Sequence, residues 1–439
     1  MFDYVFDPEK WEEFYDNFSS NEHAYKNDIK ILREYIDSEK YLEILREYEN
    51  TGMFPVPRLI MLSKKGTDKK RTVFSFDEDV SWILKFYGYF LHEYDGIFSD
   101  NLYSFRKERS VKTAVNRLIN VKNLSQMYGV KLDIHDYFNS ADTDIIIRKV
   151  KEVLEGQDKL VALFENILRN PGYISECRKF DLSDYDESSK ETDSCFIQDN
   201  RCGLINDVVH KGMMAGSPLS PFLANLYLDE LDKHFDSFNG SNGFYARYSD
   251  DIIFFTETEE ELETEMEFVH EVLSQNKLTL NPDKVCFINL GEQFEFLGFS
   301  YRYEDSENSS RNQPKMVIDV SKASFEKIKK KLKRKSRAVL RWKVRRQIDA
   351  EKAARVYIKY FNRKFFENPV KSELTWCRWY FPVITTDTTL REIDHYMQEC
   401  IRFLYTGKHT KRNYNLRYET IKELGYRSLV NEYHKNDEG

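Results

Sequence analysis

Residues 244–255 read Phe-Tyr-Ala-Arg-Tyr-Ser-Asp-Asp-Ile-Ile-Phe-Phe, an apolar and aromatic run interrupted by two adjacent carboxylates. Apolar and aromatic residues favour β-structure, so the pattern predicts two strands, Phe244–Tyr248 and Ile252–Phe255, joined by a tight turn. Asp250 and Asp251 would be costly to bury, whereas carboxylates at an exposed turn can hold a hard cation such as Mg²⁺. Asp also favours turns in general, so the pair alone more often marks an ordinary turn.

A third acidic residue, Asp133, stands near the end of a short apolar run, Val130–Ile134, which predicts another strand. Alone, it is equally compatible with a helix N-cap. If the strands are neighbours in one sheet, Asp133, Asp250 and Asp251 lie together at the strand ends. Phosphoryl transfer uses such an arrangement, because two metal ions roughly 3.5–4 Å apart can bridge the attacking hydroxyl, the phosphate and the leaving group.

The remaining pattern is a mixture of helices and strands. Helical spacing is expected in residues 1–50, 80–94, 110–126, 142–170, 218–231 and 262–273, and again in the C-terminal region. Strands are expected at Arg58–Leu62 and Arg71–Phe76, with a polar loop between them. Two polar stretches, Asp181–Ser194 and residues 304–313, are expected to be surface loops.

The charge of the chain is unevenly distributed. The net charge is −8, yet the segment from Lys322 to Lys364 holds about 18 Lys and Arg against three acids, so the rest carries about −23. A basic segment in an acidic chain favours a localised phosphate-binding face. A solvated charged helix remains the alternative.

Several protein classes are unlike this sequence. No apolar run approaches the roughly 20 residues needed to cross a bilayer, and the acidic N-terminus does not have the pattern of a signal peptide. Six cysteines are scattered without a Cys-x-x-Cys pair, which favours reduced thiols in a cytoplasmic protein. They are Cys177, Cys195, Cys202, Cys286, Cys377 and Cys400.

Seven short motifs follow one another within residues 56–300. They are Ser63–Arg71, Asn101–Ser110, Lys131–Ile134 with Tyr137-Phe138, Ala215–Leu228, Tyr248–Asp251, Leu280–Lys284 and Phe296–Phe299. In order and spacing they resemble the prokaryotic reverse transcriptases, the group that includes group II intron, retron and defence-associated enzymes.

The resemblance implies a catalytic metal site. Asp133 and Asp250 would bind two Mg²⁺ ions, with Mn²⁺ as a substitute, together with the backbone carbonyl of Ile134. Asp251 would be a third and weaker carboxylate. Lys284 would protonate the leaving pyrophosphate, although a surface lysine is the alternative.

The resemblance also implies a site for the incoming deoxynucleotide. Its residues would be Lys64, Lys65, Arg71, Phe138, Gly216 and Ser217. Arginine suits a triphosphate because its planar fork pairs with phosphate oxygens, and a bulky ring at Phe138 would exclude a 2′-hydroxyl. A plain core aromatic is the alternative for Phe138, and a solvated basic turn is the alternative for Lys65.

Nucleic acid would be held by two further groups of residues. Arg106 and Arg109 could contact the template backbone, and the basic stretch 327–346 would form the thumb that grips the duplex. Within that stretch the expected contacts are Lys330, Lys331, Lys333 and Arg334.

The sequence departs from the family pattern in three places. Ala215 stands where most members have Gln, which bears on template or primer positioning. The interval from Asp133 to Gly216 is long, and no endonuclease motif follows Phe299. The resemblance is therefore strongest to the small bacterial defence-associated (abortive-infection and unknown-group) reverse transcriptases.

The expected fold is α+β, a right-hand polymerase with antiparallel palm sheet and an all-helical C-terminal thumb region. The expected parts are an N-terminal helical segment 1–55, fingers and palm 56–303, and a basic region 314–439. The expected function is RNA-directed DNA synthesis on a structured, dedicated non-coding RNA, in anti-phage defence, with RNA, DNA and dNTPs as partners. Untemplated or protein-primed synthesis and an inactive RNA-binding scaffold remain alternatives, and a homo-oligomer is left open.

Overall fold

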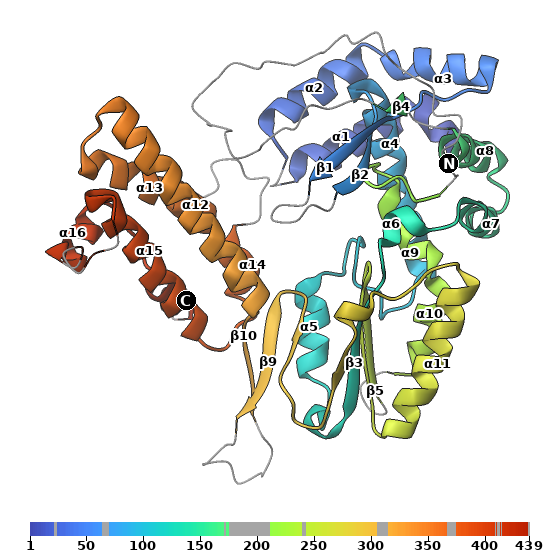
Figure 1. The fold of residues 1–439 in the computed structure, drawn as a ribbon. Coiled ribbons are helices and arrows are strands. Elements are labelled where there is room, and N and C mark those ends of the chain that lie inside the picture. Colours follow the sequence, from blue (N-terminus) through green and yellow to red (C-terminus); the bar gives the residue numbers. More distant parts are fainter. Residues whose placement is uncertain are drawn as a thin grey trace.

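The computed structural model describes residues 1–439 except 22–23, 64–69, 171–172, 175–210, 239–242, 305–314, 367–374, 409, 411–412, 414 and 438–439. The predicted loops at Asp181–Ser194 and 305–313 lie outside the described residues, as do Lys64, Lys65 and the side chain of Arg71. Figure 1 shows three parts: helices around a small sheet at the top, a larger sheet below it, and a helical arm to one side.

The N-terminal part consists of helices that pack around aromatic side chains. The elements are η1 (Phe2–Phe6), α1 (Pro8–Ser20), α2 (Lys26–Asp37), α3 (Lys40–Thr51) and α4 (Glu78–Phe90), followed by η2 (Leu91–Ile97). Trp11 is fully buried, with its ring centroid 4.4 Å from that of Tyr41 and 4.3 Å from that of Phe86. The prediction of helices in residues 1–50 is confirmed.

A small sheet follows in the order β2-β1-β4. Its strands are β1 (Arg58–Ser63), β2 (Lys70–Ser75) and the short β4 (Tyr173–Ile174). β1 and β2 are antiparallel, as predicted for the hairpin that carries the basic loop.

The larger sheet has the order β5-β6-β3-β7, and all its pairs are antiparallel. Its strands are β3 (Tyr128–Asp133), β5 (Gly243–Tyr248), β6 (Asp251–Thr256) and β7 (Cys286–Ile288). Side chains alternate between two cores: Ile252 and Phe254 join the core shared with the N-terminal helices, whereas Ile253 and Phe255 join the core shared with the helical arm. The sheet therefore ties both halves of the molecule together.

Helix α5 (Val111–Ile119) packs on one face of this sheet and α11 (Glu259–Gln275) packs on the other (Figure 1). The other helices of this part are α6 (Tyr137–Ser140), α7 (Thr143–Val153), α8 (Asp158–Arg169), α9 (Ser220–Tyr227) and α10 (Asp229–His234). Single-turn 3₁₀ segments are η3 (Leu124–Gln126), η5 (Phe235–Ser237) and η6 (Pro282–Lys284).

Two predicted helices are shorter than expected. The helix predicted for 110–126 ends at Ile119, because Asn120 leaves helical geometry and Asn123 takes a left-handed conformation (φ 56°). The helix predicted to continue through Leu231 is interrupted at Leu228, where φ −119° and ψ 24° separate α9 from α10.

A second three-stranded sheet, order β10-β9-β8, joins the palm to the helical arm. Its strands are β8 (Phe294–Phe296), β9 (Phe299–Glu304) and β10 (Lys315–Val320). The arm consists of α12 (Lys322–Arg346), α13 (Ala350–Phe365), α14 (Trp376–Tyr380), α15 (Thr388–Thr406), α16 (Tyr418–Glu423) and α17 (Leu429–Asp437). Because β10 pairs with β9, the C-terminal region begins with one strand and is helical only from Lys322, which refines the all-helical prediction.

The α+β prediction is confirmed, while the segment boundaries at 55, 303 and 314 stay a proposal. Among the described residues, no helix is both long and apolar enough to cross a membrane.

Candidate active site

The three predicted carboxylates come together at one end of the larger sheet. Asp133 ends β3 directly opposite Asp251, which begins β6, and the Ile134 N–H donates to the carbonyl oxygen of Asp250 at 3.1 Å. Directly opposite residues of an antiparallel pair share one face of the sheet, so the side chains of Asp133 and Asp251 lie on the same side. The condition set by the sequence pattern, that these strands are neighbours in one sheet, is met.

The Asp133 carboxylate already has a cationic partner. Its Oδ2 lies 2.6 Å from Lys284 Nζ, and its Oδ1 accepts from Asn281 Nδ2 at 3.3 Å. Asp133 is 5% exposed, whereas the Lys284 side chain is 56% exposed and reaches in from η6. The ammonium group of Lys284 therefore lies beside the Asp133 carboxylate.

Burial and repulsion between carboxylates raise the pKa values of the other two carboxyl groups, Asp250 and Asp251. Burial raises the pKa of Asp250, and the negative charge of Asp133 adds to that rise. Burial raises the pKa of Asp251 to about 6; Lys131 opposes the rise, and Asp250 and Asp133 add to it. A bound cation would relieve this repulsion, because it favours the charged form of each carboxylate.

The donor set fits Mg²⁺ in its chemistry, because hard cations prefer carboxylate and carbonyl oxygens. Within the described ranges, however, no three or more His, Cys, Asp or Glu side chains are gathered around a common point for a metal. Asp133 Oδ2, on one of the predicted metal ligands, is in contact with Lys284 Nζ.

The turn that carries Asp250 is fixed by buried polar groups, which we call the turn clamp: Ser104, Asn225, Asp232, Arg247 and Ser249. Ser249 has a left-handed backbone (φ 62°), its N–H donates to Ser104 Oγ at 3.0 Å, and its carbonyl accepts from Arg247 at 3.3 Å. Ser104 Oγ donates to Asn225 Oδ1 at 3.1 Å, and Asn225 Nδ2 donates back to the Ser104 carbonyl at 2.9 Å.

An ion pair with no solvent exposure anchors this clamp. Arg247 Nε donates to Asp232 Oδ1 at 2.7 Å, a second guanidinium nitrogen bonds Oδ2, and the Tyr245 hydroxyl donates to Oδ1 at 2.8 Å. Arg247 also donates to the carbonyls of Ala224 and Asn225 in α9. Burial raises the pKa of the Asp232 carboxyl, and the guanidinium opposes that rise.

Sequence reasoning missed this clamp. Its one available signal was an arginine, Arg247, inside an otherwise apolar strand, Phe244–Tyr248. Such a charge requires a buried partner, but nothing in the local pattern pointed to Asp232.

The residues predicted for the nucleotide are carried by separate segments of the chain. Phe138 is half-buried on α6, five residues after Asp133 in the sequence. A Cβ added to Gly216 (φ 99°) would lie 2.8 Å from the Phe74 carbonyl of β2, so the close backbone approach here is to the small sheet. Ser217 is buried, and its hydroxyl accepts from the Leu219 N–H at 3.3 Å. The nucleotide roles stay predictions.

The two predicted template arginines are engaged within the protein. Arg106 donates to the backbone carbonyls of Ser99 at 2.7 Å and Asp95 at 2.8 Å, and Arg109 pairs with Asp100. In this structure Arg106 therefore braces its own loop, and a template contact remains only a prediction for both residues.

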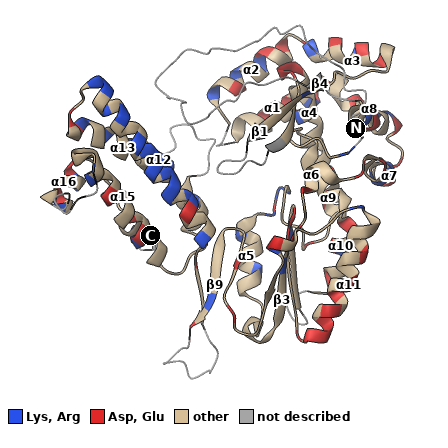
Figure 2. Cartoon of the chain, viewed as in Figure 1, with Lys and Arg blue, Asp and Glu red and all other residues tan. Residues whose placement is uncertain are grey.

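The basic stretch lies on α12, with Lys330, Lys331, Lys333 and Arg334 all exposed. Its opposite side, including Ile328 and Leu332, is buried against α13 and α15. Figure 2 shows Lys and Arg gathered along α12, in contrast to the acidic residues along α11.

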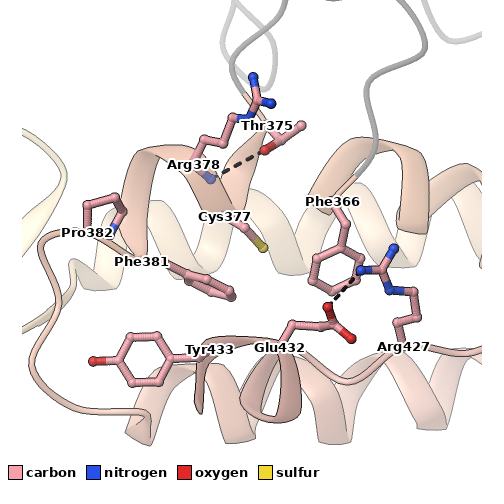
Figure 3. Close-up of a pocket in the computed structure, with 9 residues that line it drawn as sticks. All are labelled: Phe366, Thr375, Cys377, Arg378, Phe381, Pro382, Arg427, Glu432 and Tyr433. Atoms are coloured by element: carbon pink, nitrogen blue, oxygen red, sulfur yellow. Dashed lines mark hydrogen bonds and ion pairs between the residues drawn. The ribbon is translucent and has the colours of Figure 1, made fainter. Parts of the chain in front are cut away.

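A separate pocket of about 530 Å³ lies in the helical arm, between α14 and α17 (Figure 3). Two of its charged groups form an ion pair: Arg427 bonds Glu432 at 2.7 Å and stacks over the Phe366 ring at 4.4 Å. Burial raises the pKa of the Cys377 thiol, so this sulfur stays protonated and unreactive at neutral pH. The pocket shares no residue with the carboxylate site.

The comparison with known families agrees with this arrangement. Residues 62–301, more than half of the chain, match the family described as reverse transcriptase (RNA-dependent DNA polymerase). The chain belongs to the reverse transcriptase family. The match contains both aspartate-bearing strands and the turn clamp, and it begins within β1 of the small sheet.

Relatives of this reverse transcriptase are distant. The retron Ec86 reverse transcriptase of Escherichia coli is 32% identical over 72 residues, which cover 16% of this chain and 22% of the retron enzyme. The aligned part thus spans about a fifth of that relative.

Among solved structures, telomerase from Candida tropicalis in complex with a TWJ fragment of telomeric RNA is similar at TM-score 0.41 and 13% identity. That match covers 89% of this chain and 68% of the telomerase chain. Apo telomerase from the same organism has TM-score 0.43 and 11% identity, with 89% and 74% covered.

Proposed function

We propose that this reverse transcriptase is an RNA-directed DNA polymerase that adds deoxynucleotides to a primer by two-metal nucleotidyl transfer. The observation that carries the proposal is the register of β3 against β6, which sets Asp133 opposite Asp251 with Asp250 in the adjoining turn. Carboxylates gathered at strand ends are what phosphoryl transfer to a hydroxyl requires.

Asp133, Asp250 and the Ile134 carbonyl would hold the Mg²⁺ ions, and Asp251 would add negative charge beside them. When bound, these ions would stabilise the charge that develops on the transferring phosphoryl group. Lys284 Nζ lies 2.6 Å from Asp133 Oδ2, and this ammonium group would serve as the general acid for the leaving pyrophosphate.

The remaining predicted residues would position the substrates. Lys64, Lys65 and Arg71 would bind the triphosphate from the β1–β2 hairpin, and Phe138 would contact the sugar. Gly216 and Ser217 would let the backbone closely approach the base or sugar of the incoming nucleotide. The exposed basic side of α12 would hold the duplex by its phosphates, which requires only closely spaced positive charges.

For the biological role we propose copying of a dedicated, structured non-coding RNA in the cytoplasm, in defence against phage. The support is the resemblance of the motif set to defence-associated enzymes and the retron relative.

The enzymatic proposal is tested by primer extension with the full-length protein, an RNA template, dNTPs and Mg²⁺. The expected product is DNA complementary to the template, absent when RNA or metal is omitted. DNA made without template, or DNA covalently attached to the protein, would instead support untemplated or protein-primed synthesis.

The template and the role need separate experiments. Sequencing the nucleic acid that copurifies with the protein is expected to return one structured RNA and its DNA copy, whereas a random sample of cellular RNA would contradict a dedicated template. Phage challenge of cells that carry the wild-type protein or Asp250→Asn should give protection only with the former.

A second candidate is an RNA-binding scaffold that has lost catalysis. It is favoured by one observation: Lys284 neutralises Asp133, and no three side chains suited to a metal are gathered in the described part of the chain. RNA binding without any extension at millimolar Mg²⁺ or Mn²⁺ would support the scaffold.

A further inference from the structure

Phe105 has an unusual backbone for a bulky residue. Its φ is 55°, in the left-handed region that large side chains rarely adopt, and its ring is 38% exposed. Strained residues persist where the surroundings hold them in place, and they gather at functional sites.

The residues on both sides hold Phe105 in this conformation. Ser104 is fully buried, and its hydroxyl accepts the Ser249 N–H and donates to Asn225. Arg106 donates to the carbonyls of Ser99 and Asp95, which closes the loop behind it. Hydrogen bonds on both sides of Phe105 therefore hold the backbone from which its ring projects.

The ring of Phe105 points at two residues of the candidate active site. Its centroid lies 6.5 Å from that of Phe138 with an interplanar angle of 86°, an edge-to-face contact, and 6.4 Å from that of Tyr248. Such aromatic pairs are attractive beyond the area they bury.

Phe138 is also held by contacts other than the one with Phe105. Its backbone carbonyl accepts the Met213 N–H at 2.7 Å, and its ring meets Tyr137 at 5.7 Å and 75°. Tyr137 is itself fully buried, and its hydroxyl donates to the Ala224 carbonyl at 2.6 Å. Phe138 is thus flanked by one buried and immobile ring and by the partly exposed ring of Phe105.

We propose that Phe105 is a positioning residue for sugar selection, which holds the Phe138 ring in the orientation that excludes a 2′-hydroxyl. The inference rests on the proposed polymerase function and on the proposed contact of Phe138 with the sugar. Phe105 itself need not touch the nucleotide; without its ring, Phe138 can turn away and leave room for a ribose.

The test is single-nucleotide addition on a primed RNA template, with the ratio of kcat/KM for dNTP to that for the matching NTP as the readout. Phe105→Ala should lower the ratio roughly three- to tenfold, the range that corresponds to one lost aromatic pair. Phe138→Ala should lower it further. The double variant should be no less selective than Phe138→Ala alone, because Phe105 acts through Phe138.

Three further variants separate the ring from its backbone and from general effects. Phe105→Tyr keeps the ring and should keep the ratio, while Phe105→Gly relieves the strained backbone but removes the ring and should behave as Phe105→Ala. Phe287→Ala, which removes an exposed ring (57%) on β7, should leave the ratio unchanged. Thermal melting of each variant confirms that it is folded.

The outcomes are distinguishable. A wild-type ratio in Phe105→Ala, with a lowered ratio in Phe138→Ala, overturns the inference and leaves the polymerase function standing. Full additivity in the double variant also overturns it, because the two rings would then act independently. A wild-type ratio in Phe138→Ala removes the sugar contact and the inference with it, and absence of extension by wild-type protein overturns the proposed function as well.

Discussion

The turn clamp and helix α12 both depend on charged residues, but they use charge in opposite ways. In the clamp, Arg247 and Asp232 have no solvent exposure and satisfy each other through two guanidinium bonds. On α12, Lys330, Lys333 and Arg334 are exposed, with one acid, Glu326, in the whole helix.

The difference determines how each region responds to change. A buried charge that loses its partner keeps its full desolvation cost. Removal of either Arg247 or Asp232 should therefore destabilise the whole clamp. Exposed charges of one sign contribute separately through counterion release, so α12 should weaken in steps.

The largest effect is expected from the carboxylates at the strand ends, of which the clamp positions Asp250. Asp133→Asn or Asp250→Asn should abolish nucleotide incorporation with little change in melting temperature, because the amide lacks the negative charge that metal binding needs. Primer extension and thermal melting measure both quantities. Asp283→Asn, an exposed acid in the neighbouring 3₁₀ turn, is the matched control and should remain active; near-normal extension by either site variant would remove the site assignment.

The next largest effect tests the buried pair. Arg247→Met leaves Asp232 without its cation and should lower the free energy of unfolding by about 3–5 kcal/mol. Chemical denaturation of the variant beside Arg302→Met provides the contrast, because Arg302 forms an exposed pair with Glu304 and its loss should cost less than about 1 kcal/mol. Equal losses in the two variants would show that burial does not set the strength of the clamp.

A smaller effect is expected at Ser104. Ser104→Ala leaves the buried Ser249 N–H without its acceptor, which should cost about 1–3 kcal/mol of stability. Because that peptide group precedes Asp250, kcat should fall while the affinity for RNA stays the same. The control is Ser20→Ala, which removes an exposed hydroxyl bonded to a helix carbonyl. A loss of stability with unchanged kcat would mean that Ser104 supports only the fold.

The smallest effect per residue is expected on α12. Replacing Lys330, Lys331, Lys333 and Arg334 together with Gln should weaken RNA binding and reduce the slope of log affinity against log salt by about three. The loss should be similar for unrelated RNA sequences, because phosphate contacts carry no base information.

A matched control changes the net charge by the same amount elsewhere. Lys30, Lys40, Lys151 and Lys159 are exposed lysines in ion pairs on other helices. Their replacement by Gln should leave the salt slope unchanged, and if both quadruple variants bind as wild type does, RNA is held by other parts of the molecule.

Much of the palm could be predicted from local sequence. The strands on both sides of Ser249 were predicted within one residue, because a run of β-favouring residues is interrupted there by three polar ones. The helices of the N-terminal part were predicted from helical spacing, and the strands β1 and β2 were predicted from two β-favouring runs with a polar loop between them. The helix at 110–126 was overestimated, since the pattern gave no weight to the left-handed Asn123.

The contacts that complete the site could not be predicted in this way. Arg247 finds its partner on α10, and Ser249 finds Ser104 in a loop far back in the chain. The Lys284–Asp133 pair likewise joins segments far apart in the sequence. Local periodicity carries no information on such pairings, which depend on the register of strands and helices in the finished fold.

The junction between β10 and α12 connects the helical arm directly to the β8–β9–β10 sheet. A single residue, Ser321, separates the two elements; its N–H donates to the Gly298 carbonyl at 3.0 Å, and the Lys322 N–H donates to Glu295 at 2.8 Å. With 25 residues, α12 extends about 37 Å from this junction. A tilt of about 5° at its base would therefore move the far end of the helix by about 3 Å. The position of the basic side chains at the far end of α12 is therefore sensitive to small changes in the β8–β9–β10 sheet.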